Sequence, residues 1–131
     1  AQEGALKLKE ISYINCSAFA AGELKHGSLA LVEDGTPVFV IANDEKIFEK
    51  TMNSAFEAKS RGAKLYLVSS LSPKQSEADN FEDIILLPKC GKSLANIMAV
   101  VPLQLLSYWT CIFKNLNPDK PRNLAKSVTV E

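Results

Sequence analysis

Apolar residues first recur at helical spacing and later form continuous runs. The opening stretch QEGALKLKEISYINCSA, residues 2–18, places Leu8, Ile11 and either Ile14 or Asn15 on one side of a helix, with charged residues on another. The sequence therefore predicts an amphipathic helix here. No Ser, Thr, Asp or Asn precedes Gln2 as a cap, so we expect this helix to begin inside a larger element.

Three short apolar runs predict strands. They are VFVIA after the turn at residues 34–37, KLYLVS, and DIILLP after the polar loop SPKQSEADNFED. Between the first two runs, Asn43 is placed to cap a helix over residues 44–61 that Gly62 ends, and the buried side of this helix would carry Phe48, Met52, Ala55 and Phe56. Strands alternating with helices predict an α/β fold, a three-layer α/β/α lobe with a mostly parallel sheet covered on both faces.

A long uncharged stretch follows, from Ser93 to Phe113. Its 21 residues are long enough for a membrane span, but it contains Ser, Asn, Gln and Thr side chains and is the only such segment in a charge-balanced chain. We expect a buried helix that Pro102 kinks or breaks. No signal peptide pattern is visible, and from residue 117 onward the sequence is polar and interrupted by proline.

Composition excludes several classes of partner. Fifteen Lys and Arg balance fifteen Asp and Glu, so no net field favours nucleic acid or an anionic membrane. Cys16, Cys90 and Cys111 form no CxxC pair, which predicts free thiols in a reducing cytoplasm. One histidine and three scattered cysteines match no zinc spacing, and no calcium-loop pattern occurs, so we expect neither a metal nor another cofactor.

Gly91, Lys92 and Ser93 imitate the end of a phosphate-binding loop between a strand and a helix. The leading glycine of that motif would fall at Leu86, so the preferred interpretation is an N-cap serine beside a solvated lysine. A phosphate at this helix start stays open as the less favoured alternative.

Glu3, Lys7 and Glu10 lie at i, i+4, i+7 spacing, on one helix face. A solvated ladder of ion pairs is the simplest interpretation, because such surface pairs are common and weakly stabilising. His26, the single histidine, sits in the glycine-flanked turn LKHGS, where the pattern alone favours an exposed or structural role over a catalytic one.

Four strings change these interpretations: EGALKLKEISYI (3–14), AAGELKHG (20–27), VPLQLLSY (101–108) and PRNLAKSVTVE (121–131). Together they resemble the C-terminal sugar isomerase (SIS) region of the glucosamine-6-phosphate synthase family. The last string has no periodicity that core packing would require. The resemblance extends over essentially the whole chain and is weakest between residues 43 and 92.

The resemblance implies roles for six residues. Lys126 would form a Schiff base with an open-chain keto sugar, Glu10 would move a proton between C1 and C2, and Lys7 would assist it. His26 would help open the sugar ring and would come from a neighbouring subunit, which implies a homodimer. Glu3 would support substrate binding, and Ala125 would offer backbone contacts to the sugar.

The family's activity converts fructose 6-phosphate and glutamine to glucosamine 6-phosphate and glutamate. By this resemblance, residues 1–117 would be the second SIS lobe, truncated at its N-terminus, and residues 118–131 a tail that closes the active site. The partners implied are the sugar phosphate and the glutaminase domain and first SIS lobe of a parent chain. The 131-residue chain alone is expected to be inactive.

The sequence departs from the family pattern at Ser28, where proline usually follows KHG, and at Asn15, Cys16, Ser17 and Phe19. These changes spare the ionisable groups but leave the stiffness of the His26 turn open. Two rival hypotheses remain: a non-catalytic phosphosugar-binding SIS module, which would not need Lys126, and an unrelated α/β interaction domain, in which Glu3, Lys7, Glu10 and the tail would be unconnected.

Overall fold

The computed structural model describes residues 1–124 and divides into two compact units. One unit joins the two ends of the chain, residues 1–18 and residues 103 onward, and the other contains residues 19–102. Residues far apart in sequence therefore meet in the first unit, while the second is built from one continuous stretch.

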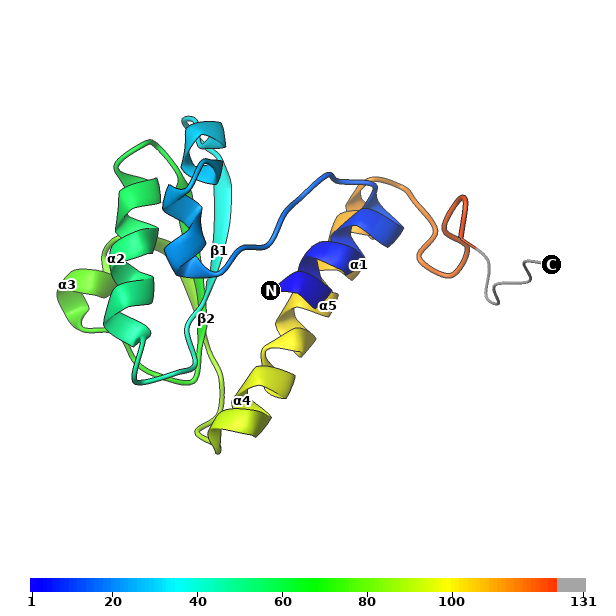
Figure 1. Ribbon diagram of the computed structural model, residues 1–131. Coiled ribbons are helices and arrows are strands. Elements are labelled where there is room, and N and C mark those ends of the chain that lie inside the picture. The colour runs from blue at the N-terminus through cyan, green and yellow to red at the C-terminus, as the bar shows by residue number, and fades with distance from the viewer. Residues whose placement is uncertain (125–131) are drawn as a thin grey trace. The chain divides into compact units, whose positions relative to one another are not determined.

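The second unit contains a parallel sheet of three strands in the order β1-β2-β3 (Figure 1). The strands are β1 (Pro37–Ile41), β2 (Lys64–Ser69) and β3 (Phe81–Leu86). Since parallel neighbours need crossover connections, helices separate the strands in sequence. The predicted α/β class with a parallel sheet is confirmed. The predicted strand KLYLVS coincides with β2, and the other two are displaced by one and two residues from β1 and β3.

The core of this unit lies where α2 (Phe48–Lys59) packs on the sheet. Met52 and Ala55 are buried and Phe48 and Phe56 are partly buried against the core, as their helical spacing predicts. On β2 the alternate residues Leu65 and Leu67 are fully buried in this core. The strand β3 lies at one edge of the sheet and is less covered than its apolar sequence predicts.

The predicted cap at Asn43 is wrong. The helix α2 begins at Phe48, and the buried Asn43 instead donates from Nδ2 to the Ala95 carbonyl at 3.2 Å and accepts from the Ser70 amide at 2.9 Å. Asn43 thus connects the carboxyl ends of β1 and β2 to the helix that contains Ala95. The helix α2 ends at Lys59, two residues earlier than predicted, and Gly62 after it adopts a φ of 94°, in the left-handed region that favours glycine.

Short helices occupy stretches that the sequence pattern left as turns or loops. Two 3-10 helices precede β1, η1 (Ala21–Lys25) and η2 (Ser28–Leu31). The predicted polar loop between β2 and β3 contains the one-turn helix α3 (Gln75–Ala78).

The long uncharged segment is broken where proline requires it. It forms α4 (Lys92–Met98) and α5 (Val100–Phe113), separated at Ala99. Pro102 lies in the first turn of α5, where its missing N–H would otherwise bond back to Met98. Within residues 1–124, Ser93–Phe113 is the one stretch whose length and composition would allow it to cross a membrane. The expected burial of α5 is found on one side only: Leu103, Ser107 and Cys111 are buried, while Leu105, Trp109 and Phe113 are exposed.

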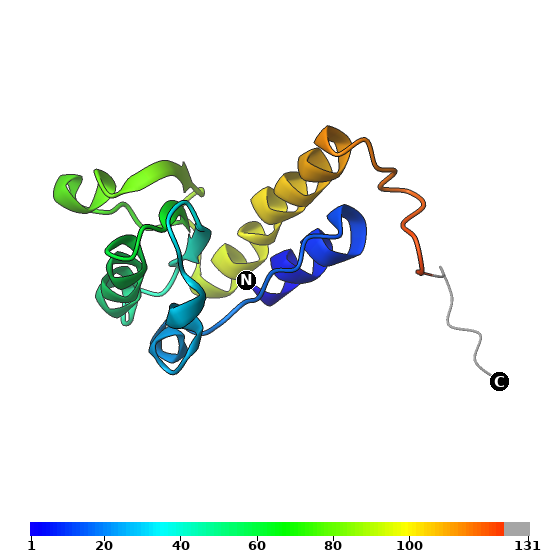
Figure 2. The same ribbon diagram turned by 90° about the horizontal axis from the view of Figure 1, so that it is seen from above.

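The first unit is built on two helices, α1 (Gln2–Ser12) and α5, which lie side by side (Figures 1 and 2). Gly4 faces Leu103, and a Cβ at position 4 would meet the Leu103 Cδ1 at 2.8 Å. Eight residues further along α1, the buried Ser12 hydroxyl donates to the Ser107 carbonyl at 3.0 Å. The two helices therefore run in the same direction, and only glycine at position 4 allows their close approach.

The predicted helix over residues 2–18 is too long. It begins without a side-chain cap, as predicted, but it ends at Ser12 because Tyr13 adopts a left-handed conformation with a φ of 56°. Lys114, at the end of α5, donates from Nζ to the Ser12 carbonyl at 2.6 Å. A cation thus satisfies one of the free carbonyls at the C-terminus of α1, the end at which helices favour positive charge.

Candidate functional site

The charged stripe on α1 is an ion-paired cluster in the structure. Lys7 Nζ lies 2.7 Å from Glu10 Oε2 and 3.6 Å from Glu3 Oε1. The Glu10 side chain is 28% exposed and that of Glu3 is 46% exposed. The strong contact is therefore the less exposed Lys7–Glu10 pair, and Glu3 is a weaker outer member of the cluster.

This cluster holds Lys7 in its charged form. The hydrogen bond to Glu10 is the main cause that raises the pKa of Lys7 above its usual value of 10.5, with a smaller contribution from Glu3. A lysine with a raised pKa is a poor nucleophile at neutral pH, because attack on a carbonyl needs the neutral amine. Lys7 is therefore suited to pairing with the Glu10 carboxylate and unsuited to forming an imine.

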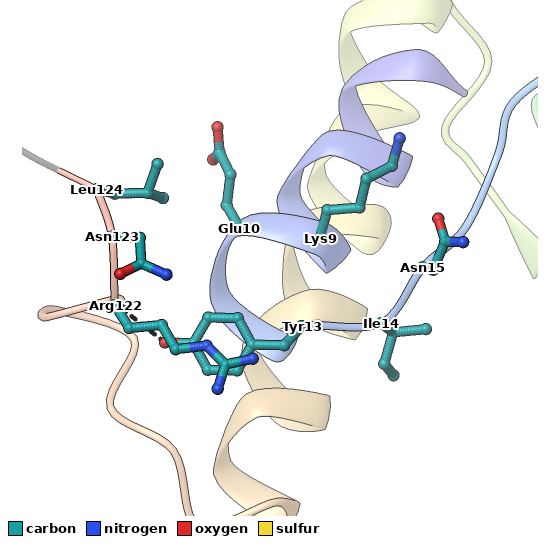
Figure 3. Close-up of a pocket in the computed structure, with 8 residues that line it drawn as sticks. All are labelled: Lys9, Glu10, Tyr13, Ile14, Asn15, Arg122, Asn123 and Leu124. Atoms are coloured by element: carbon teal, nitrogen blue, oxygen red, sulfur yellow. Dashed lines mark hydrogen bonds between the residues drawn. The ribbon is translucent and has the colours of Figure 1, made fainter.

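An open pocket of about 460 Å³ lies beside Glu10. It is lined from three parts of the first unit, namely the end of α1, the residues that follow it and the start of the C-terminal tail (residues 118–131). Its lining residues are Lys9, Glu10, Tyr13, Ile14, Asn15, Arg122, Asn123 and Leu124 (Figure 3). Glu10 thus faces a hollow between α1 and the tail. A simple ladder of solvated ion pairs on a helix surface would not require such a pocket.

Two residues of this pocket have a left-handed backbone. Tyr13 has a φ of 56° and Asn123 a φ of 61°; within the described residues Asn115 is the third non-glycine residue of this kind. Asparagine tolerates the conformation, but for a bulky aromatic residue it is rare and costs about 1 kcal/mol or more. Such strain persists only where the surroundings hold it, and here Tyr13 has it at one side of the pocket.

Tyr13 and Arg122 connect the two sides of the pocket. The Tyr13 hydroxyl accepts a hydrogen bond from the Arg122 backbone amide at 2.7 Å, drawn as a dashed line in Figure 3. The Arg122 guanidinium lies over the Tyr13 ring, with its central carbon 4.1 Å from the ring centroid. The same tyrosine therefore holds the start of the tail through a backbone contact and a side-chain contact.

Cys16 supports the loop that leaves α1. Its thiol donates to the Ala5 carbonyl at 3.2 Å, and burial raises the pKa of this thiol. A thiol kept protonated is a weak nucleophile, so Cys16 serves the fold of this loop. Cys16, Cys90 and Cys111 are all free thiols, as predicted.

His26 belongs to the second unit. It is exposed and follows η1, next to Gly27, which has a φ of 131°. Its predicted place in an open, glycine-containing turn is confirmed. The structure thus brings Glu3, Lys7 and Glu10 together in the first unit, while Ala125 and Lys126 lie outside the described residues.

The imitation of a phosphate loop has no structural counterpart. The helix α4 begins at Lys92 with Gly91 as its N-cap, so the predicted N-cap role of Ser93 is wrong. Leu86, at the position of the motif's leading glycine, is the last residue of β3. Among residues 1–124, no group of three or more His, Cys, Asp or Glu side chains is placed to hold a metal ion.

Sequence reasoning missed Tyr13, Arg122 and Asn123. The spacing in ISYINC favours continuation of the helix, so nothing in the hydrophobic pattern marks the left-handed turn at Tyr13. Arg122 and Asn123 stand in the string PRNLAKSVTVE, and their position beside Lys126 is the only signal that would have selected them.

The sequence model of the SIS domain family matches residues 1–114 of this chain. Among curated proteins, the isomerizing glutamine–fructose-6-phosphate aminotransferases of Pyrococcus horikoshii, Thermococcus kodakarensis and Zymomonas mobilis are 51%, 50% and 47% identical to it. Each alignment contains the whole chain but only 21–22% of the relative. The chain therefore spans about a fifth of the length of the curated relatives it matches.

Solved structures show the same fold. The C-terminal domain of glucosamine-fructose-6-phosphate aminotransferase from Francisella tularensis matches with a TM-score of 0.79 and 37% identity, over 91% of this chain and 33% of that one. The glucosamine-6-phosphate deaminase of Thermotoga maritima matches with a TM-score of 0.72 and 30% identity, over 97% of this chain and 35% of that one. The chain therefore belongs to the SIS domain family and matches the C-terminal portion of isomerizing glutamine–fructose-6-phosphate aminotransferases.

Proposed function

We propose that this chain is the isomerase part of an enzyme that converts fructose 6-phosphate and glutamine to glucosamine 6-phosphate and glutamate. The observation that carries the proposal is the pocket beside Glu10, a carboxylate paired with a cation and facing the start of the tail that contains Lys126. The names of the relatives, whose alignments include the whole chain, support the reaction and its place in amino sugar synthesis.

In this proposal Lys126 is the nucleophile. Its amine attacks the C2 ketone of the open-chain sugar, and loss of water gives an imine. Ammonia released from glutamine then adds to C2 and displaces the lysine amine, which frees Lys126 and leaves fructosimine 6-phosphate. Attack requires the neutral amine, which a partly dehydrated sugar site favours over the ammonium form. Lys7 is a poor alternative because its pKa is raised by Glu10. Ala125, next in the chain, would contribute backbone contacts to the sugar.

Glu10 is the proposed acid and base of the isomerisation. Starting from fructosimine 6-phosphate, its carboxylate takes a proton from C1 while the imine nitrogen gains one, which leaves a C1–C2 double bond. Glu10 then returns a proton to C2 as the C1 hydroxyl loses its own, giving an aldehyde at C1 and an amine at C2. Lys7 forms the 2.7 Å ion pair with the Glu10 carboxylate and assists this transfer, and Glu3 supports Lys7 and the substrate.

His26 is proposed to help open the sugar ring from a neighbouring subunit of a homodimer. Its exposure in a turn that contains glycine supports a role at a surface shared with another chain. The other proposed partners are the glutaminase domain and first SIS lobe of the parent enzyme, since the relatives are about five times as long. Residues 1–117 would form the second lobe and residues 118–131 the tail, and the 131-residue chain alone would be inactive.

The proposed location is the cytoplasm, without a nucleic acid or membrane partner. The SIS family match spans residues 1–114 and so includes the whole apolar stretch Ser93–Phe113. This supports packing of that stretch within the domain. The equal numbers of acidic and basic residues offer no field for phosphodiester backbones.

A non-catalytic phosphosugar-binding module is the alternative. Replacing Glu10 by Gln in the full-length protein separates the two functions, because glutamine keeps the shape of the side chain and cannot accept the C1 proton. We expect kcat for glucosamine 6-phosphate formation to fall by about 10² to 10⁴, the usual contribution of a general base.

The matched control is Glu3→Gln, which alters the outer member of the same cluster. We expect a change of less than about tenfold, because Glu3 makes only the longer 3.6 Å ion pair with Lys7. Retention of full activity in Glu10→Gln would exclude the proposed isomerase chemistry, and binding of fructose 6-phosphate without any turnover by the wild-type protein would establish the binding module.

A further inference from the structure

The pocket beside Glu10 has two walls that the chain connects only over a long distance. One wall is the end of α1 and the other begins at Arg122, and 109 residues separate Tyr13 from Arg122. The relative position of the walls therefore depends on contacts between them. Within the described residues, the hydrogen bond from Arg122 to Tyr13 and the stacking of Arg122 on Tyr13 are the polar and aromatic contacts that join them.

These two contacts differ in what they fix. The Tyr13 hydroxyl accepts from the backbone amide of Arg122, so this hydrogen bond does not depend on the side chain of residue 122. It determines which residue of the tail lies opposite the end of α1. The guanidinium stacked on the ring adds attraction and restricts the direction of the chain. Asn123, the next residue, then turns the backbone through a left-handed conformation.

The backbone strain of this arrangement lies at Tyr13. Tyr13 adopts its strained backbone at the end of α1, three residues after Glu10, and this conformation is part of the path by which the chain leaves the helix. Since the ring and hydroxyl that hold Arg122 belong to this same residue, the strain and the contact occur together. Strained residues of this kind concentrate at functional sites.

We propose that Tyr13 is a positioning residue that holds the start of the C-terminal tail in a fixed register against Glu10 through its contacts with Arg122. The inference rests on the proposed function, in which Lys126 and Glu10 act on adjacent carbons of one substrate. Lys126 follows Arg122 by four residues in the sequence, so covalent geometry limits their Cα–Cα distance to about 14 Å. A register set at Arg122 is therefore passed on to the nucleophile over a short length of chain.

Both partners are accessible, Arg122 being exposed and Tyr13 partly buried, so the contact adds little to global stability. A shift of about 1 Å at a reacting group is enough to lower a rate strongly. Loss of the contact should consequently lower kcat and leave KM and the unfolding temperature nearly unchanged. A residue with a merely structural role would show the opposite pattern.

The test uses the full-length protein with Tyr13→Phe, which removes the hydroxyl acceptor and keeps the ring, and Arg122→Gln, which removes the cation and keeps the backbone amide. The matched control is Tyr66→Phe, which removes the hydroxyl of a ring that stacks on Phe39 in the sheet of the other unit. Hydrogen exchange of the segment that contains the Arg122 amide reports the contact itself, independently of activity. Steady-state kinetics and borohydride labelling of Lys126 report its consequence.

In Tyr13→Phe we expect exchange at Arg122 to become about tenfold faster and kcat to fall about tenfold, with KM within about twofold and slower labelling of Lys126. Arg122→Gln should lower kcat in the same way, and Tyr66→Phe should change neither quantity. Unchanged exchange in Tyr13→Phe, or faster exchange with an unchanged kcat, would overturn the proposal. A wild-type protein that forms no glucosamine 6-phosphate would instead refute the proposed function, a result visible without any variant.

Discussion

The ion pair between Lys7 and Glu10 on α1 makes the stability of the protein depend on pH. Its pKa is raised chiefly by the hydrogen bond from its Nζ to Glu10. A group whose pKa is higher in the folded than in the unfolded protein contributes stability below the unfolded pKa and loses it as the pH rises through the folded one. The contribution of Lys7 is therefore complete at neutral pH and is lost above its usual pKa of 10.5.

Comparison of the wild type with Lys7→Gln measures this contribution. The difference in free energy of unfolding should be constant between pH 7 and 9 and should shrink as the pH rises beyond 10.5. Urea unfolding at each pH gives the difference, and Lys9→Gln, on the same helix, is the control. A difference that grows with pH would show that the sign of the Lys7 shift is wrong.

Some residues of the candidate site could be predicted from the sequence and others could not. The spacing of Glu3, Lys7 and Glu10 places them on one face because helical periodicity is local, and their ion pairs are confirmed. The partnership of Tyr13 with Arg122 could not be predicted this way, because it joins residues 109 positions apart. Hydrophobic periodicity contains no information on such a contact.

At the scale of elements, α1 is positioned by its close packing on α5. Replacing Gly4 by Ala places a Cβ 2.8 Å from the Leu103 Cδ1 and 2.9 Å from its Cβ, which belongs to the rigid base of that side chain. Alanine favours the helix by about 1 kcal/mol, but overpacking costs about 1–3 kcal/mol. We expect Gly4→Ala to be destabilising on balance, by about 1 kcal/mol.

Thermal or urea unfolding checks this expectation. Gly22→Ala is the matched control, because nothing lies within 4 Å of a Cβ built there, and it should change the stability by less than about 0.5 kcal/mol. The double variant Gly4→Ala/Leu103→Ala should show favourable coupling, since the smaller residue 103 removes the clash. A more stable Gly4→Ala protein would mean that the helices do not approach as closely as described.

The elements themselves were largely predictable. Continuous apolar runs selected the strands, and Pro102 selected the break between α4 and α5, since both follow from local rules. The start of α2 was not predictable, because Asn43 is used to bond Ala95 and Ser70 instead of capping the next helix. Competition from such long-range partners is invisible in a short sequence window.

At the scale of the whole molecule, the proposed dimer makes a distinct prediction for His26. In the full-length enzyme, His26→Ala and Lys126→Ala subunits should each be nearly inactive alone. If His26 acts across the subunit boundary, a hybrid dimer of the two contains one site with both residues intact. Random pairing of equal amounts should then restore about a quarter of the wild-type activity, as expected for a two-fold symmetric dimer.

Coexpression with two different affinity tags isolates the hybrid for this measurement. Mixing two batches of the same variant controls for activation by coexpression itself. Absence of recovery in a confirmed hybrid dimer would place His26 and Lys126 of one subunit in the same site.

The central claim is that Lys126 forms an imine with the sugar, and reductive trapping tests it most directly. An ordinary lysine has a pKa of about 10.4, so only about one in two thousand is neutral at pH 7, and a functional imine requires a site that favours the neutral amine. Lys126→Arg keeps the charge but cannot form the imine, and Lys120→Arg in the same tail is the control. Borohydride reduction of the full-length enzyme with fructose 6-phosphate should add one reduced sugar phosphate to the peptide that contains Lys126, in the wild type and in Lys120→Arg but not in Lys126→Arg. Labelling at another lysine, or full activity in Lys126→Arg, would contradict the account.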